Sequence, residues 1–433
     1  MTSEVPYTVT PWEVKGVINY DKLIHQFGCT KIDGALIKRI HQLTRYPVHI
    51  WLRRGLFFSH RDLNSLLDAY EKKEQIYIYT GRGPSNKMHL GHCIPFEFTK
   101  YLQDAFGAIV IIQLSDDEKY YFKKEKKPLS YFRDMATENA KDIIAMGFNP
   151  NKTYIFKNSV ELTRNPGLFH NFILMADSTS GSAIEASFGL STSNASGKKS
   201  NTVGQIVWPI FQSVPAFSSS FSKIFRHDTK PRYCLIPMAI DQDPYFRIAR
   251  DFASHAKYLK PCCIHSEFLV GLGGMDQKMS STCATPTIFL TDTPKEIEKK
   301  VKSHAFSGGG DTLELHREHG GNLTVDVAYQ YLIYFLDDDV QLEVIANEYS
   351  SGRMTTGEIK KIAIQCIVDY VQKLQLTKST LTDADVAHFF NDDRDFDNSV
   401  PIREPVVLLS DEEYEKMGLG FDRYFGLLKS SPE

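Results

Sequence analysis

Two short apolar runs separated by one helical segment place the strongest constraint on the fold of this chain. The runs are residues 76–80 (IYIYT) and 108–114 (AIVIIQL). β-branched and aromatic residues favour strands, and unbroken apolar runs are typical of parallel strands that helices cover on both faces. A third run at 233–240 (YCLIPMAI), followed by a helical pattern over 245–253, extends this alternation. We therefore predict an α/β fold with a doubly wound, Rossmann-like parallel sheet.

The segment before the first run has the apolar spacing of helices. Residues 1–74 repeat apolar side chains at helical intervals around Leu36 and Ile40 and again around Leu66. We expect this segment to be a mostly helical N-terminal extension. The α/β domain then spans residues 75–295.

The C-terminal third has a different pattern. Residues 296–395 read as an all-α domain, in which Thr355 and Glu358 form a capping box at the start of a helix. The tail at 396–433 has no role that the sequence indicates. The stretch 178–200, which is rich in Ser, Gly, Ala and Thr, predicts a loop, either mobile or a plain surface connection.

Charge and cysteine content exclude several classes of protein. Lys and Arg number 50 and Asp and Glu 53, for a formal net charge of −3, so no overall basic field exists to hold nucleic acid non-specifically. The 7 cysteines include no C-x-x-C spacing, which argues against a disulfide framework or a zinc site. The sequence shows neither a signal peptide nor the roughly 18 consecutive apolar residues of a membrane span. We expect a cytosolic protein in a reducing compartment that does not contact membranes.

The first segment with chemical content is residues 79–92 (YTGRGPSNKMHLGH), which follows the first predicted strand. Its glycines let the backbone approach a ligand, and the following helix start supplies N–H groups and a positive dipole end for phosphate. His89 and His92 are three residues apart and can donate to phosphate oxygens, while Gly91 leaves room for a ring or ribose. Zinc is the rival interpretation of the two histidines, but the H-E-x-x-H pattern is absent.

The second segment is residues 273–282 (GGMDQKMSST), a glycine-opened loop with one lysine and three hydroxyls. The usual phosphate loop and dinucleotide fingerprints do not occur in the chain, so a nucleotide needs another holder. A mobile cation such as Lys278 can follow the charge of a departing pyrophosphate. Such a loop alone does not indicate a function. It does so only because it occurs together with the histidine segment.

Together, HLGH at 89–92 and KMSST at 278–282 resemble the signature pair of the class I aminoacyl-tRNA synthetases. Within that class the sequence resembles the eukaryotic cytosolic tryptophanyl-tRNA synthetases over about residues 8–390. Further motifs carry the likeness in the same order: GRGPS at 81–85, DDEKY at 116–120, LIPMAIDQDPYFR at 235–247 and HAFSGG at 304–309.

The resemblance implies a tryptophan–tRNA ligase. Such an enzyme activates L-tryptophan with ATP and Mg²⁺, has no tightly bound cofactor or protein-bound metal, charges tRNA(Trp), and forms a cytoplasmic homodimer. It also implies that 75–295 is the catalytic domain, with a dimerisation or connective insertion at about 120–232, and that 296–395 binds the anticodon. Two alternatives remain: a tyrosyl-tRNA synthetase, and a non-catalytic relative that binds RNA or regulates.

The same resemblance assigns site residues one by one. The expected tryptophan-binding residues are Tyr79, Gln113, Glu118, Gln212 and Gln242. The expected ATP-binding residues are Thr80, Gly81, Arg82, Gly83, His89, Gly91, His92, Lys119, Asp241, Lys278, Met279, Ser280 and Ser281. The expected catalytic residues are His89, His92, Lys119, Lys278 and Ser280.

Some assignments have structural alternatives. Gln113 could instead cap a strand end. Asp241 and Asp243 could bind ribose hydroxyls, although a solvated helix cap is an equal reading for Asp243. The family loop usually reads KMSAS, so Thr282 must supply the last hydroxyl here.

The expected tRNA contacts are fewer. Asp311 is the anticodon candidate, although Gly310 stands where the family often has arginine. A lysine-rich stretch with interleaved aromatic residues is either a track for the acceptor strand or a solvated face. Its lysines are Lys119, Lys123, Lys124, Lys126 and Lys127.

Overall fold

The computed structural model describes residues 7–12, 14–16, 18–123, 125, 127–191, 200–226, 228, 230–279 and 287–419. Its strands are β1 (Thr8–Val9), β2 (Val14–Lys15), β3 (Thr30–Lys31), β4 (Phe57–Arg61), β5 (Ile76–Arg82), β6 (Ile109–Leu114), β7 (Thr153–Lys157), β8 (Tyr233–Ala239), β9 (Cys262–Ser266), β10 (Val270–Gly271) and β11 (Gly274–Lys278).

Helices precede, connect and follow these strands. The helices that precede β9 in the sequence are α1 (Tyr20–Phe27), α2 (Gly34–Thr44), α3 (Ile50–Arg53), α4 (Leu63–Glu71), α5 (Leu90–Phe106), α6 (Asp116–Phe122), α7 (Leu129–Ile144), α8 (Asn158–Arg164), α9 (Pro166–Ser178), α10 (Gly181–Phe188), α11 (Val203–Ser213) and α12 (Asp243–Ala256). Short 3-10 helices are η1 (Pro150–Lys152), η2 (Val214–Ala216), η3 (Ser218–Phe221) and η4 (Ile240–Gln242). The remaining helices are α13 (Pro294–His304), α14 (Leu313–His319), α15 (Val327–Phe335), α16 (Asp339–Ser350), α17 (Thr356–Thr380), α18 (Asp383–Phe389) and α19 (Asp411–Lys416).

The main sheet confirms the predicted α/β fold. Among the described residues it has seven strands in the order β3-β4-β9-β8-β5-β6-β7. The five strands from β9 to β7 are parallel, and β3 and β4 add an antiparallel edge. The apolar runs predicted at 76–80, 108–114 and 233–240 are β5, β6 and β8. Ligands of such sheets bind at the carboxyl ends of the parallel strands.

The two faces of this sheet face different cores because successive side chains of a strand alternate. In β5, Ile76 and Ile78 contribute to one apolar cluster, and Tyr77 and Tyr79 contribute to the other. The first cluster includes buried residues of α2, α4, α5 and α7 and continues into α15, α16 and α17. The second includes residues of α9, α10, α11 and α12. Tyr79 therefore points to the face that α11 and α12 cover.

Two local expectations were incomplete. Strands β3 and β4 lie in the segment 1–74, which was expected to be mostly helical, and they extend the main sheet. Helix α10 lies in the segment 178–200, which was expected to be a loop. Ser180 caps this helix by accepting a hydrogen bond from Ala183 N, and Ile184 and Phe188 are buried. Residues 192–199 lie outside the described residues.

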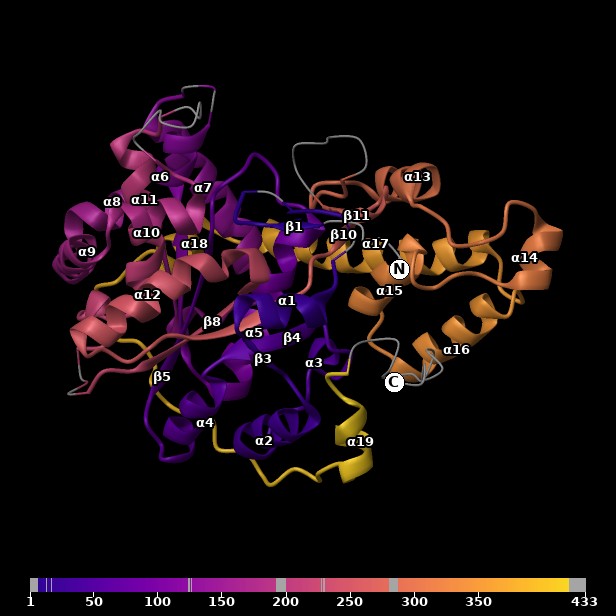
Figure 1. The fold of residues 1–433 in the computed structure, drawn as a ribbon, viewed down its shortest axis with the longest axis horizontal. Helices are drawn as coiled ribbons and strands as arrows, with labels where there is room; N and C mark the ends of the chain where they lie inside the picture. Colours follow the sequence, from indigo (N-terminus) through magenta and orange to yellow (C-terminus); the bar gives the residue numbers. More distant parts are fainter. Residues whose placement is uncertain are drawn as a thin grey trace.

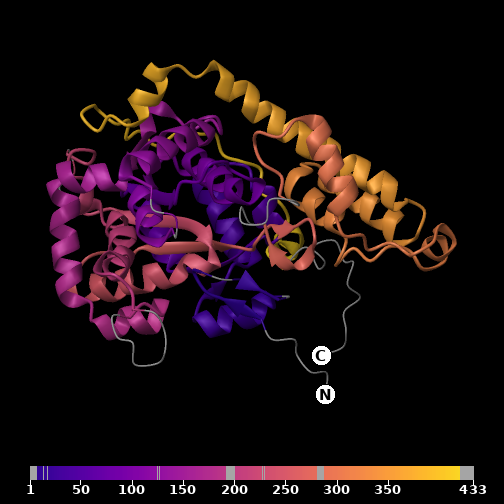
Figure 2. The ribbon, with the colours of Figure 1, turned by 90° about the horizontal axis from the view of Figure 1, so that it is seen from above.

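The C-terminal third is helical, as its sequence pattern predicts. Helices α13 to α17 gather beside the sheet, at the right of Figure 1. The capping box of Thr355 and Glu358 opens α17 as predicted. Figure 2 shows α17 running from this group of helices back across the α/β part, where α18 follows it. Along this path Lys378 of α17 pairs with Asp142 of α7 at 2.6 Å.

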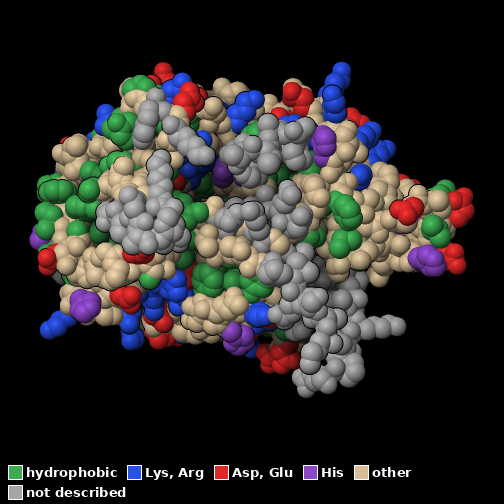
Figure 3. All heavy atoms as spheres, turned by 45° about the horizontal axis from the view of Figure 1, so that its top comes forward, with side chains coloured by type: hydrophobic (Ala, Val, Ile, Leu, Met, Phe, Trp, Pro, Cys, Tyr) green, Lys and Arg blue, Asp and Glu red, His purple; other side chains and the backbone are tan. Residues whose placement is uncertain are grey.

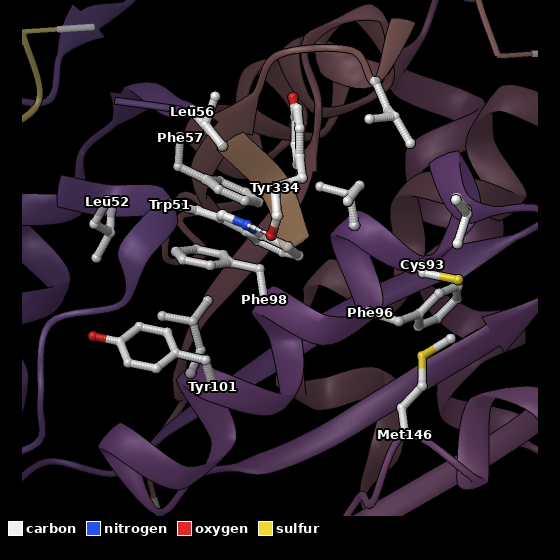
Figure 4. Packing of buried hydrophobic residues seen from close by; sticks show 14 of the residues in the cluster. Trp51, Leu52, Leu56, Phe57, Cys93, Phe96, Phe98, Tyr101, Met146 and Tyr334 are labelled. Carbon is white, nitrogen blue, oxygen red and sulfur yellow. Dashed lines mark hydrogen bonds between the residues drawn. The ribbon is translucent and has the colours of Figure 1, made fainter. Parts of the chain in front are cut away.

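The two parts share one apolar core around Trp51 of α3. Figure 4 shows Trp51 beside Phe57, Phe98 and Tyr334 of α15. The rings of Phe57 and Phe98 stack with centroids 3.6 Å apart, and Trp51 Nε1 donates to the carbonyl of Tyr334 at 2.9 Å. The helical part is therefore joined to the α/β part by buried contacts rather than by a linker alone.

The described part of the tail also packs on the body. Arg403 donates to carbonyl oxygens of Thr44, Asp104 and Ala105. Tyr414 of α19 forms a buried hydrogen bond of 2.6 Å with Nδ1 of His41 on α2. The tail up to residue 419 thus ties the end of the helical part to the N-terminal extension.

The described cysteines are free thiols, and Cys283 lies outside the described residues. Among the described residues, no helix has the length and apolar character needed to cross a membrane.

A buried ion pair between the two parts generates the first prediction. The side chain of Arg54 is fully buried, donates to Asp339 Oδ1 at 2.8 Å and also donates to the carbonyls of Ile333 and Leu336. Asp339→Asn leaves this guanidinium buried without a counter-charge, so we expect a loss of about 3 kcal/mol of unfolding free energy. Urea denaturation measures it. The exposed acid on the same helix provides the control Glu343→Gln, and equal stability of the two variants would contradict the assignment.

Candidate active site

A cavity of about 380 Å³ opens at the carboxyl ends of β5, β6 and β8. It brings together most of the predicted site residues, although they come from distant parts of the chain. Those that line it are Tyr79, Thr80, Gly81, Arg82, Gly83, His89, Gly91, His92, Gln113, Glu118, Lys119, Gln212, Asp241, Gln242 and Met279.

Three oxygen atoms meet at one wall of this cavity. Parallel pairing sets Gly81 opposite Gln113, so Tyr79 and Gln113 lie on the same face of neighbouring strands. Tyr79 Oη lies 2.7 Å from Gln113 Oε1 and 2.7 Å from the main-chain oxygen of Gln212. These three oxygens carry a single proton, that of the tyrosine hydroxyl. Burial raises the pKa of Tyr79 well above its usual value, so this proton is retained.

A second polar group lies on α6, directly after β6. Glu118 accepts from Ser115 Oγ at 3.0 Å and from Lys119 Nζ at 3.1 Å. Gly83 faces this pair, because a Cβ at that position would overlap Glu118 Oε2 and the end of Lys119. Across the cavity, Gln212 Nε2 donates to Gln242 Oε1 at 3.1 Å. The site therefore holds a carboxylate and two amides, which can bind an ammonium and a carboxylate group.

The two histidines lie where α5 begins. His89 is the N-cap residue, and its backbone N–H donates to His92 Nδ1 at 3.2 Å. Their rings stack with centroids 3.5 Å apart. A Cβ on Gly91 would already contact the ring of His89 at 3.3 Å, which keeps larger residues from this approach. The N-terminal end of α5 thus brings two imidazoles and the positive end of a helix dipole to the cavity, and these groups can hold an anion.

Arg82 lies beside the glycine turn. Its guanidinium donates to Ser85 Oγ at 2.6 Å and to the carbonyl of Gly83 at 3.2 Å. Burial lowers the pKa of Arg82 to about 10, which still leaves it cationic at neutral pH. Arg82 stiffens the turn and adds positive charge at the anion end of the cavity.

Several lining residues were missed by sequence reasoning. Trp12 of the N-terminal segment lines the cavity, stacks near Phe122 at 4.8 Å and donates from Nε1 to the carbonyl of Phe188. Trp208 and Tyr245 form an apolar wall, with ring centroids 5.4 Å apart. Apolar residues of this kind carry no motif, and only the fold brings them to the site.

Some predicted residues lie outside the cavity or outside the described part of the chain. The backbone of Lys278 ends β11, which pairs with β10 and β2, so this lysine lies at a strand end and not within a loop as expected. Residues 280–286, which include Ser280, Ser281 and Thr282, are not among the described residues. Asp311 is exposed beside α14, away from the residues lining the cavity. Of the lysine-rich stretch, Lys124 and Lys126 are likewise not described.

Asp243 corrects one expectation. It neither lines the cavity nor caps a helix in solvent, because its side chain is fully buried. Arg61 donates to both of its oxygens, at 2.6 and 2.8 Å, and His265 Nε2 lies 3.2 Å away. Burial alone would raise its pKa, but the bonds from His265 and Arg61 lower it below the usual value.

A possible metal-ligand group includes this aspartate. Cys29, Asp243 and His265 place ligand atoms within 4.8 Å of one another. The guanidinium of Arg61 already neutralises Asp243, and burial raises the pKa of Cys29 to about 11, so its thiol stays protonated. A cation at this position would compete with a fixed positive charge. Among the described residues the group therefore offers a poor metal site.

An acidic pair lies behind the cavity at the start of α6. Asp116 accepts from Ser159 N at 3.0 Å, and Asp117 accepts from Asn158 Nδ2 at 2.7 Å and from Glu118 N at 3.0 Å. Burial, with a further contribution from the charge of Asp116, raises the pKa of Asp117 to about 7. Asp117 therefore titrates near neutrality although it is almost completely buried.

Comparison with known proteins agrees with this geometry. The profile of the family "tRNA synthetases class I (W and Y)" matches residues 71–372. The chain is 48% identical over 385 residues to the cytoplasmic tryptophan–tRNA ligase of Mus musculus, covering 89% of this chain and 78% of that protein. It is 46% identical over 395 residues to the Schizosaccharomyces pombe counterpart, covering 89% and 97%. The crystal structure of Plasmodium falciparum tryptophanyl-tRNA synthetase is similar with a TM-score of 0.79 and 45% identity, covering 87% of this chain and 96% of that chain.

The raised pKa of Asp117 generates a prediction for stability. Because the folded state favours the protonated acid, its contribution to stability is complete at acidic pH and is lost as pH rises toward 7. Between pH 5 and 7 the unfolding free energy of the wild type should fall by about 2 kcal/mol relative to Asp117→Asn. Denaturant titrations at several pH values measure this difference. Asp134→Asn, at an exposed acid, should show no such trend, and a parallel course of wild type and Asp117→Asn would contradict the prediction.

Proposed function

The chain belongs to the class I tRNA synthetases of the tryptophan and tyrosine type, and we propose that it is the tryptophan–tRNA ligase of this family. The observation that carries the choice of amino acid is the group of three oxygens at Tyr79, Gln113 and Gln212, which share one proton. Such a group is completed by a ligand that donates a hydrogen bond from an apolar ring. The indole N–H of tryptophan is that donor.

The remaining polar groups suit the backbone of an amino acid. Glu118 binds the ammonium group, and the amides of Gln212 and Gln242 bind the amino and carboxyl groups. Trp208 and Tyr245 supply apolar contact for the ring. Phenylalanine would leave the buried oxygens unpaired, which is the kind of mismatch that binding sites reject most strongly.

The opposite end of the cavity is proposed to hold ATP. The positive end of the α5 dipole, the rings of His89 and His92, and Lys119 face the phosphates, while Asp241 accepts from ribose hydroxyls. Mg²⁺ would enter with ATP as part of the substrate and would offset the charge of the phosphates. Glu118, Asp241 and Glu267 are the carboxylates among the described residues that line this cavity. Glu118 and Asp241 are assigned to other groups, which leaves Glu267, so we expect the phosphates and water to supply most of the metal ligands.

Catalysis follows from position and charge. A carboxylate oxygen of tryptophan attacks the α-phosphorus of ATP, the bond from this phosphorus to the bridging oxygen breaks, and pyrophosphate leaves with the electron pair. His89, His92, Lys119 and Lys278 stabilise the charge that develops, and Ser280 is assigned an assisting role. In the second step a ribose hydroxyl at the 3′ end of tRNA attacks the acyl carbon, and AMP leaves.

Each domain is assigned a role, either in catalysis or in tRNA binding. We propose that residues 75–295 form the catalytic domain, with an insertion at about 120–232, and that 296–395 bind the anticodon. Asp311 stands exposed next to α14, where an extended strand of RNA can reach it. The lysine-rich stretch after Glu118 is a candidate track for the acceptor strand. Several relatives are named as cytoplasmic enzymes, and we place this chain in the same compartment.

Pyrophosphate exchange into ATP tests the proposed function. Without tRNA, the purified protein should exchange pyrophosphate when tryptophan is present and should not do so with tyrosine. Exchange with tyrosine instead would favour a tyrosyl-tRNA synthetase and discard the roles of Tyr79 and Gln113. Absence of exchange with both amino acids would favour a non-catalytic relative.

Lys278→Ala should slow the activation step without weakening tryptophan binding. We expect a reduction of about 10²-fold or more in the exchange rate, because the side chain is proposed to act on the phosphates as charge develops. Equilibrium binding of tryptophan should stay within about twofold of wild type. The exposed lysine of α13 provides the control Lys295→Ala, and an equally large loss of tryptophan affinity in Lys278→Ala would refute the role.

The homodimer implied by the family has a candidate surface on α9. Leu168, Asn171 and Met175 are buried on one side of this helix. On the opposite side Phe169 is 48% exposed and Ile173 is 51% exposed. Figure 3 shows apolar side chains gathered at the left end of the molecule, where α9 lies. We propose that a second copy of the chain covers this apolar face.

A charged residue in this face should separate the dimer. Sedimentation equilibrium at micromolar concentration is expected to give twice the chain mass of 49.3 kDa for the wild type and the chain mass itself for Ile173→Asp. The reason is that an unpaired carboxylate cannot be buried in an apolar interface. Val340→Asp, at an exposed apolar position of α16, should leave the dimer intact. A wild-type protein that sediments as a monomer would overturn this proposal.

A further inference from the structure

A chain of buried hydrogen bonds connects Asp117 to the oxygen group that faces the indole. Asp117 Oδ2 accepts from Asn158 Nδ2 at 2.7 Å, and Asn158 Oδ1 accepts from Gln113 Nε2 at 2.9 Å. Gln113 Oε1 then accepts from Tyr79 Oη at 2.7 Å. Asn158 is fully buried and Asp117 is 4% exposed, and neither residue lines the cavity. They lie directly behind the residues that do.

The direction of each bond in this chain follows from the group at its end. An ionised carboxylate can only accept, so the end of Asn158 that faces Asp117 must be its NH₂ group. Asn158 then presents its oxygen to Gln113, which must answer with its own NH₂ group. The other N–H of Gln113 donates to the carbonyl of Phe211 at 3.0 Å, which also can only accept. Gln113 is thereby left with its oxygen toward Tyr79 and the cavity.

The direction of these hydrogen bonds matters because a carboxamide can rotate and exchange the positions of its oxygen and its NH₂ group with little change of shape. If Gln113 turned over, an NH₂ group would face the indole N–H, and two donors would meet without an acceptor. Tyr79 would also lose the acceptor on that side. Selection of an N–H donor therefore depends on what fixes the amide, and not only on the presence of a glutamine.

We propose that Asn158 and Asp117 are positioning residues that fix Gln113 as a hydrogen-bond acceptor and thereby set the preference of this site for a side chain that carries an N–H. This inference rests on the proposed function, since it concerns the same amino acid pocket. It adds two specificity-determining residues that never touch the substrate.

The test compares tryptophan with L-3-(benzothiophen-3-yl)alanine, in which sulfur replaces the indole N–H. The two compounds have nearly the same shape and the same ammonium and carboxylate groups, so changes in folding, in Glu118 or in the ATP site affect both alike. The readout is the ratio of their kcat/KM values in pyrophosphate exchange. Assays are run at pH 8, above the pKa of about 7 of Asp117, so that this group is ionised.

Wild-type protein should prefer tryptophan by at least about 100-fold. Asp117→Asn keeps the shape and an acceptor for Glu118 N but sets a second NH₂ group against that of Asn158. Asn158→Leu removes both amide bonds and leaves the NH₂ group of Gln113 with the carbonyl of Phe211 as its one remaining partner among those described. In each variant the preference should fall by about tenfold or more, mainly through loss of tryptophan activity.

A matched control is available at the opposite end of the same sheet. Gln103 is a buried amide that donates to Thr153 Oγ1 at 2.8 Å and accepts from Asn149 N at 2.9 Å. Gln103→Leu should lower the melting temperature and leave the preference unchanged. This control separates a general cost of losing a buried amide from a change in specificity.

The outcomes distinguish this inference from the proposed function. If the wild type exchanges pyrophosphate with neither tryptophan nor tyrosine, the proposed function fails. If it uses tryptophan with little preference over the benzothiophene analogue, the acceptor role of Gln113 is wrong, and no variant is needed to show it. If both variants lose activity equally on the two compounds, Asn158 and Asp117 are structural only. If Asn158→Leu does not fold, the preference measured for the nearly isosteric Asp117→Asn decides whether these residues set specificity.

Discussion

Parallel pairing of β5 with β6 is the constraint on which the rest of the site depends. Because the two strands run side by side in the same direction, Tyr79 and Gln113 reach the same face at the same edge of the sheet. The connection between them must then cross the sheet as a helix, and α5 begins where β5 ends. The start of α5, with His89 and His92, therefore lies at the same edge as the two residues that face the indole.

Polar groups behind the cavity determine what its lining can do. The three oxygens at Tyr79, Gln113 and the carbonyl of Gln212 share a single proton, so the site accepts a donor and disfavours an acceptor. When Asp117 is ionised, Asn158 and Asp117 maintain this state from behind the cavity, because each bond in their chain then allows only one direction. A buried network of this kind is costly when one member is missing, which makes a complete set specific.

The sequence allowed prediction of the elements whose signal is local. The strands β5, β6 and β8 were predicted from their unbroken apolar runs, and α17 from its capping box, because both signals arise from neighbouring residues. Strands β3 and β4 were missed because each is short and gains stability only from pairing with distant strands. Helix α10 was missed because its small residues resemble a loop, while its stability comes from burial of Ile184 and Phe188. Residues in motifs were found, whereas Trp12 and Asn158 gain their importance from long-range contacts. Asp117 lies in the DDEKY motif, but its role was missed because its partner Asn158 is far away in the sequence. Asp243 was misjudged for the same reason, since its partners are Arg61 and His265.

A crystal structure of the protein with bound tryptophan would show whether a fixed, donor-poor group of oxygens selects this amino acid. We expect the indole nitrogen to lie within hydrogen-bonding distance of Tyr79 Oη and Gln113 Oε1. We also expect Gln113 to keep its bonds to Asn158 and to the carbonyl of Phe211. An indole nitrogen directed elsewhere, or a Gln113 side chain that has left Asn158, would show that these oxygens do not select tryptophan.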